Sequence, residues 1–286
     1  MPGLYPFPSL SAGAVQILRS AQPAEKVALS RALIAAWRER ALAVGEAAAP
    51  VRPARPQRPV LLPPREMPKR RNFGSPAGRI ALLHALAHIE LNAIDLAWDI
   101  VARFSGAGLP EDFYADWAEV AAEEAEHFAL LNDRLNALGA EYGDLPAHDG
   151  LWEAASETAH DLLARLAVVP LVLEARGLDV TPEMIRRLER VGDNDSATIL
   201  HRLYRDEIGH VAVGARWFGW QCRERRVDPE VAFRELVRRH FTGALKPPFN
   251  RAARDAAGFP ASYYERLASL PDFRENAATA ESERMR

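Results

Sequence analysis

Two Glu-x-x-His motifs are the residues of this sequence best suited to metal chemistry. Glu124 and His127 form the first motif, and Glu207 and His210 form the second. Residues three positions apart project from the same side of a helix, so each pair can reach a single ion. Carboxylate and imidazole donors suit iron and manganese. The motifs therefore predict two metal-binding pairs, each placed on a helix.

A further glutamate precedes each motif at a matched distance. Glu90 lies 34 residues before the first motif, and Glu174 lies 33 residues before the second. In an antiparallel helix pair, residues equally far from the turn lie level, and both midpoints fall at or beside glycine-containing turns. Four glutamates and two histidines are the ligand set of a dimetal site inside a four-helix bundle. The predicted ligands, which would also be the catalytic residues, are Glu90, Glu124, His127, Glu174, Glu207 and His210.

The sequence around these candidates is apolar at helical spacing. Every residue three, four or seven positions from Glu90 is apolar, from Leu83 to Ala97. Burying a bare carboxylate costs several kcal/mol, so such a group is normally protonated, paired or bound to metal. One Glu-x-x-His alone is more often a solvated helical pair. Two copies with matched upstream glutamates favour metal binding.

Helical periodicity recurs throughout the chain, so we expect an all-α fold. Ser75 and Pro76 are a typical N-cap and first-turn pair, and proline at 23 predicts the start of an earlier helix. Gly177 and Pro182 predict an interruption of the third long helix. The expected parts are an N-terminal helical segment (1–45), a Pro-rich basic arm (46–74), a four-helix bundle (75–226) and a C-terminal helical cap (227–286). The expected long helices span about 75–104, 111–138, 151–191 and 196–224.

Composition narrows the class of protein. The 286-residue chain has a net charge of −3, which is unlike a nucleic-acid-binding polycation. Its single cysteine, Cys222, excludes an internal disulfide and a thiolate metal cluster. No apolar run approaches the length of a membrane span, and the N-terminus does not resemble a signal peptide. The sequence predicts a cytoplasmic protein.

The two Glu…Glu-x-x-His sets resemble the ferritin-like superfamily of diiron carboxylate proteins. Four stretches also resemble an uncharacterised bacterial ferritin-like family, a distant relative of the tRNA-hydroxylating diiron monooxygenase. The superfamily resemblance implies two metal ions, iron first and manganese or mixed manganese and iron as alternatives, in a centre that activates dioxygen or peroxide. The stretches are Ala87–Asp95, Asp206–His210, Pro63–Pro68 and Lys246–Asn250.

From these features we expect an oxidoreductase that oxidises or hydroxylates an unidentified small-molecule or nucleoside-type substrate. It would use an external electron donor and is compatible with a homodimer. An iron-handling ferroxidase or storage protein is one alternative. A non-catalytic helical module braced by metal is another.

Several other residues have two interpretations. Glu123 and Asp206 are either hydrogen-bond acceptors for the ligand histidines or ordinary surface acids. Tyr204, one turn before Glu207, is either a donor near the metals or a core residue, and we favour packing. His160 forms a third Glu-x-x-His but lies 14 residues before Glu174, too far along a helix to share its site. The stretch Lys246–Arg254 either closes a substrate entrance or simply packs.

The Pro-rich arm is strongly basic. A basic patch can bind RNA, but no aromatic residues are interleaved for base stacking, so we expect the arm to pack on the bundle instead. Its basic residues are Arg52, Arg55, Arg58, Arg65, Lys69, Arg70, Arg71 and Arg79, and its one acid is Glu66.

Overall fold

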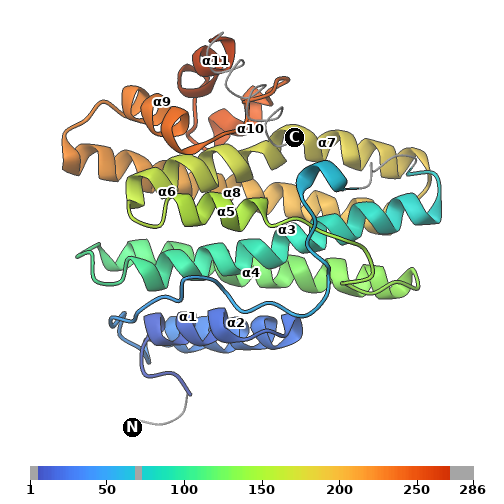
Figure 1. Ribbon diagram of the computed structural model, residues 1–286, viewed down its shortest axis with the longest axis horizontal. Coiled ribbons are helices and arrows are strands. Elements are labelled where there is room, and N and C mark those ends of the chain that lie inside the picture. Colours follow the sequence, from blue (N-terminus) through green and yellow to red (C-terminus); the bar gives the residue numbers. More distant parts are fainter. Residues whose placement is uncertain (1–5, 68–72, 271–286) are drawn as a thin grey trace. The chain divides into compact units, whose positions relative to one another are not determined.

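The computed structural model describes residues 6–67 and 73–270, which excludes the arm residues Lys69, Arg70 and Arg71. The predicted all-α class is confirmed: the described residues form helices joined by loops, and they contain no strand beyond an isolated bridge between Leu61 and Ala147. The chain divides into two compact units, 1–152 and 153–286. Each unit contributes one long helix hairpin, drawn in Figure 1 as α3–α4 and α7–α8.

The first unit is built from two stacked helix hairpins. Helices α1 (Leu10–Arg19) and α2 (Pro23–Arg38) pack against α3 (Pro76–Arg103) and α4 (Glu111–Ala137), respectively. All four helices lie where the sequence predicts them. Ser75 caps α3 because its side chain accepts a hydrogen bond from the amide of Gly78 at 3.1 Å, and Pro76 occupies the first turn.

Helix α3 is the most apolar helix of the protein. Contrary to the sequence prediction, one 18-residue window of α3 is long and apolar enough to cross a membrane. Of that window, 72% is buried inside the protein, which is typical of the core helix of a soluble protein. Its apolar character reflects packing on more than one side.

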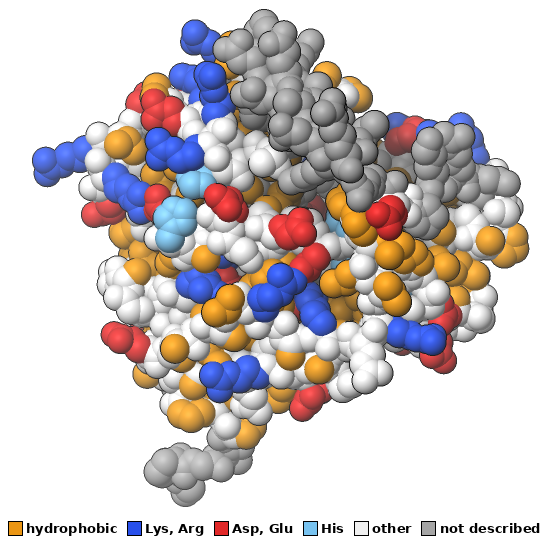
Figure 2. All heavy atoms as spheres, viewed as in Figure 1, with side chains coloured by type: hydrophobic (Ala, Val, Ile, Leu, Met, Phe, Trp, Pro, Cys, Tyr) orange, Lys and Arg blue, Asp and Glu red, His pale blue; other side chains and the backbone are white. Residues whose placement is uncertain are grey.

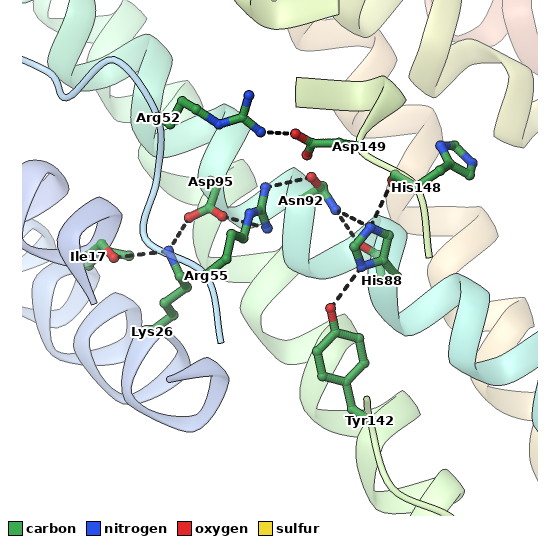
Figure 3. A network of polar contacts seen from close by, with 10 residues as sticks. All are labelled: Ile17, Lys26, Arg52, Arg55, His88, Asn92, Asp95, Tyr142, His148 and Asp149. Atoms are coloured by element: carbon green, nitrogen blue, oxygen red, sulfur yellow. Dashed lines mark hydrogen bonds and ion pairs between the residues drawn. The ribbon is translucent and has the colours of Figure 1, made fainter. Parts of the chain in front are cut away.

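A buried polar network joins α3 to the N-terminal helices and the arm (Figure 3). Lys26 on α2 forms an ion pair with Asp95 on α3, and neither side chain is exposed. Arg55 of the arm donates to the second oxygen of Asp95 at 2.9 Å and to Asn92 Oδ1 at 2.6 Å. The Lys26 ammonium also donates to the carbonyl of Ile17 on α1. Three separate segments are thus tied to one helix face.

His88 extends this network toward the loop that follows α4. Its Nε2 lies 3.0 Å from the carbonyl of His148, and its Nδ1 lies 2.8 Å from Tyr142 Oη. Burial lowers the pKa of His88 to about 4, so the ring is neutral near pH 7. A neutral ring that donates from Nε2 to the carbonyl must accept at Nδ1 from the tyrosine hydroxyl. His88 therefore anchors that loop, as expected for a histidine on a face of α3 away from Glu90.

The arm packs on the first unit, as predicted. Arg52 pairs with Asp149, and the amide of Ala54 donates to the carbonyl of Leu18 at 2.7 Å. The arm ends in a short 3₁₀ turn, η1 (Pro64–Glu66). Basic and acidic side chains are interspersed over the face shown in Figure 2. The described arginines Arg52 and Arg55 are thus engaged in contacts within the protein.

The second unit is built around helix α8 (Asn194–Arg225), which begins at the N-cap Asp193. The predicted third long helix is in fact four consecutive segments. They are α5 (Gly150–Glu157, which starts in the first unit), α6 (Leu162–Val168), the π-helical segment η2 (Val169–Glu174) and α7 (Ala175–Arg190). C-terminal to α8 lie α9 (Pro229–His240), α10 (Arg251–Ala256) and α11 (Ala261–Ser269).

The predicted interruption at Gly177 and Pro182 is wrong, because α7 continues through both residues. Proline lacks an amide hydrogen and so cannot donate to the carbonyl four residues earlier, which here belongs to Leu178. The side-chain amide of Asn250 supplies a donor instead, at 3.1 Å from that carbonyl oxygen. The chain breaks earlier, in the turn before Asp161, which caps α6.

Two close contacts fix α7 and α8 within the second unit. Gly214 on α8 lies so near Pro170 of η2 that a Cβ on this glycine would come within 2.8 Å of the proline Cγ. Arg254 on α10 is buried and donates to Asp179 on α7 at 2.7 and 2.9 Å. Its guanidinium also lies 4.4 Å from the ring centroid of Tyr264. The C-terminal helices therefore pack on the helix that follows Glu174.

Candidate metal centre

Glu90, Glu124 and His127 form a compact cluster inside the first unit. His127 Nδ1 lies 3.3 Å from Glu124 Oε2 and 3.6 Å from Glu90 Oε2. One potential ligand atom from each residue lies within 4.8 Å of the others. The three residues are buried, with 8%, 1% and 1% of their surface exposed, respectively. The α3–α4 hairpin thus brings together the three ligands predicted for it.

The electrostatics of this cluster suit a cation. Burial, followed by the nearby carboxylate of Glu124, raises the pKa of Glu90 well above its usual range. Burial alone would lower the pKa of His127, but hydrogen bonds to Glu124 and Glu90 raise it to about 11. Without a metal the cluster must therefore hold protons to offset its negative charge. A divalent cation can replace those protons, because metal binding requires deprotonated ligands.

Glu207 and His210 form the corresponding pair on α8 in the second unit. His210 Nδ1 lies 3.4 Å from Glu207 Oε2. The histidine side chain is 1% exposed and the glutamate side chain 17% exposed. Gly177 on α7 faces this glutamate, since a Cβ built on the glycine would lie 3.7 Å from Glu207 Cγ. The pair is therefore positioned by α8 and bordered by a residue with no side chain.

Glu174 is the last residue of the π-helical segment η2. Such segments are frequent at functional sites because the extra residue re-aims the side chains around it. Gly177 lies three residues later, on about the same side of the helix, and faces Glu207. Glu174 is partly buried. Its place on α7 is thus consistent with the predicted ligand role, although the irregularity lies before it rather than after it.

The remaining sequence candidates have ordinary surroundings. Glu123 is exposed, and Asp206 lies 3.5 Å from the Nε atoms of both Arg202 and Arg205. His160 lies in the turn after α5, where its ring is 5.5 Å from that of His240.

Asn250 is a residue that sequence reasoning did not assign to the site. Its side-chain amide donates to Tyr204 Oη at 2.8 Å as well as to Leu178. The signal that was available is the proline at 182, which implies that some other group must satisfy the carbonyl of Leu178.

Comparison with known proteins places this arrangement in a family. Residues 19–265 match the family described as "Protein of unknown function (DUF455)". The chain belongs to the DUF455 family. The matched range includes all six predicted ligands and both helix hairpins.

One relative is an uncharacterized protein of Haemophilus influenzae. It is 44% identical over 211 residues, which cover 71% of this chain and 72% of the relative. No solved structure matches the chain significantly. Membership of the DUF455 family therefore carries no assigned activity, and the function must be inferred from the clusters themselves.

Proposed function

We propose that this DUF455 protein is a dimetal carboxylate oxidoreductase with a ferritin-like four-helix bundle. In this proposal the α3–α4 and α7–α8 hairpins each supply half of one ligand set. The observation that carries it is the buried cluster of Glu90, Glu124 and His127, three ligand types brought together from two helices. The Glu207–His210 pair repeats two of these elements on α8.

The donor set fits iron or manganese better than other common metals. Oxygen and imidazole nitrogen are the available donors in both clusters, and the single cysteine, Cys222, lies elsewhere on α8 with a thiol pKa that burial raises to about 11. Two divalent cations balance four carboxylates in charge. We propose two ions per chain, with iron first and manganese or a mixed pair as alternatives.

The protein residues have distinct tasks in this proposal. Glu124 and Glu207, which begin the two Glu-x-x-His motifs, are placed to bridge the ions, while His127 and His210 each bind one. The low exposure of both histidines keeps water from these ligands. When bound, the metal pair supplies the reactivity toward dioxygen or peroxide; the helices supply ligand geometry and a dry environment.

The substrate and partners are part of the same proposal. We propose a small-molecule or nucleoside-type substrate, an external electron donor and a cytoplasmic location. The contacts of Arg52 and Arg55 within the first unit favour a structural role for the arm over RNA binding.

Oxygen reactivity of the iron-loaded protein tests the proposal. Two equivalents of Fe(II) per chain are added without oxygen, and air is then admitted while the near-ultraviolet and visible spectrum is recorded. We expect a new absorption band that saturates at about two irons per chain and is lost in Glu124→Ala. Continued iron uptake far beyond two per chain would instead indicate a storage protein. Bound metal that does not react with oxygen or peroxide would indicate a metal-braced module.

A further inference from the structure

The side-chain amide of Asn250 connects two groups from different helices. Its Nδ2 donates to Tyr204 Oη on α8 at 2.8 Å and to the carbonyl oxygen of Leu178 on α7 at 3.1 Å. A single amide nitrogen carries two hydrogens, so both bonds can form at once. The hydroxyl oxygen of Tyr204 is thereby held beside the turn of α7 that contains Leu178.

Glu207 contacts the same turn of α7. Gly177, the residue before Leu178, faces the side chain of Glu207, with a built Cβ lying 3.7 Å from Glu207 Cγ and 3.9 Å from Oε1. Tyr204 and Glu207 are one turn apart on α8, and helical side chains lean toward the helix N-terminus. The Glu207 carboxylate therefore leans toward the turn that carries Tyr204. Both side chains converge on one place within the second unit.

The hydroxyl proton of Tyr204 has no acceptor in the protein. Because Asn250 donates, Tyr204 Oη acts as the acceptor in that bond. Within residues 6–67 and 73–270, Tyr204 makes no other hydrogen bond. Its side chain is only partly buried. The free O–H is thus available to a ligand that enters beside Glu207.

We propose that Tyr204 is the hydrogen-bond donor that this site offers to a small exogenous ligand, such as an anion or the oxygen atom of a substrate. Asn250 is the positioning residue that turns the hydroxyl proton away from α7 and toward that ligand. The inference rests on the proposed function, because the ligand would bind at the metal pair held in part by Glu207 and His210.

Asn250 is itself fixed by several contacts. Its amide nitrogen donates to Asp179 Oδ1 at 2.8 Å, and its side-chain oxygen caps α10 by accepting from the amide of Ala253 at 3.3 Å. Asp179 is fully buried and paired with Arg254. Arg176 also donates to the carbonyl of Lys246 at 2.7 Å. A positioning residue held at both ends loses little conformational entropy when the ligand binds.

Azide binding to the iron-loaded protein tests this inference. Azide is a small anion whose complexes with ferric iron absorb visible light, so its dissociation constant can be measured by optical titration. We expect Tyr204→Phe to retain its iron and to weaken azide binding about tenfold, since a hydrogen bond to a charged group is lost. Asn250→Ser, which retains a capping oxygen but cannot reach Tyr204, is expected to weaken azide binding about threefold.

The matched control is Tyr263→Phe, which removes a hydroxyl from the aromatic cluster of Phe218, Phe233 and Phe259 on the same unit. It should leave the azide dissociation constant unchanged. Equal azide affinity in wild type and Tyr204→Phe, both fully loaded with iron, would overturn the role of Tyr204 alone. Loss of iron from Tyr204→Phe would also overturn it, by showing a structural role. Wild-type protein that cannot be loaded with iron would overturn the proposed function itself.

Discussion

The side-chain amide of Asn250 lies 3.1 Å from the carbonyl oxygen of Leu178, the carbonyl that Pro182 leaves without its α-helical donor. A proline inside α7 is tolerated because a residue from the C-terminal segment replaces the missing amide hydrogen. The C-terminal helices are therefore part of what keeps α7 continuous after Glu174.

This relationship predicts coupling between positions 182 and 250. Asn250→Ala should lower the free energy of unfolding by about 1–3 kcal/mol, because the carbonyl of Leu178 loses its donor. In a Pro182→Ala background the restored backbone amide can serve this carbonyl, so the cost of Asn250→Ala should be smaller. Urea denaturation of the four proteins measures the coupling. Loss of the α10 cap is common to both backgrounds and cancels, so equal costs would refute the substitution of one donor for the other.

Two glycines that face neighbouring helices should respond differently to alanine. Gly214→Ala should destabilise the protein by about 1–3 kcal/mol, since the new methyl group collides with Pro170. Gly177→Ala should be neutral or stabilising by up to about 1 kcal/mol, because the space at Glu207 admits a methyl group and alanine favours the helix. Thermal unfolding of both variants tests the contrast, and the reverse order would contradict the packing described for α8.

The buried Lys26–Asp95 ion pair should be costly to break from one side. Asp95→Ala leaves a buried ammonium beside Arg55 and should destabilise the protein by about 3–5 kcal/mol. Lys26→Met together with Asp95→Leu should recover a substantial part of that loss, because no unpaired charge from the pair remains buried. Chemical denaturation of the single and double variants checks this. Additive effects in the double variant would argue against a direct pair.

The arm should contribute to stability through Arg55 rather than through its charge as a whole. Arg55→Met removes donors to Asp95 and Asn92 and should cost about 1–3 kcal/mol. Arg58→Met is the matched control: its side chain is exposed, and its effect should stay within about 0.5 kcal/mol. Thermal unfolding provides the comparison. If the arm instead bound RNA through general positive charge, both substitutions would weaken RNA binding alike and neither would lower the melting temperature.

Much of the fold follows from local signals in the sequence. The caps Ser75 and Asp193, with the helix-starting Pro23, predict helices that the structure confirms. The three ligands of the first cluster also follow from spacing, because a hairpin with a central turn places equidistant residues level.

The failures have a common physical cause. The continuity of α7 through Pro182 depends on Asn250, a residue distant in sequence, so a local rule could not predict it. The network of Lys26, Arg55 and Asp95 likewise joins segments whose approach no periodicity encodes. Helix α10 has six residues, too few for a periodic signal. The π-helical segment before Glu174 depends on packing against α8 at Gly214.

The metal content of purified protein tests the central claim most directly. Elemental analysis of wild type, Glu124→Ala, His210→Ala and the control His160→Ala, each loaded with Fe(II) and desalted, gives the number of ions per chain. We expect about two irons in wild type and in His160→Ala, and little or none in Glu124→Ala and His210→Ala. Folded wild-type protein without bound metal, or unchanged stoichiometry in the two ligand variants, would contradict the dimetal centre.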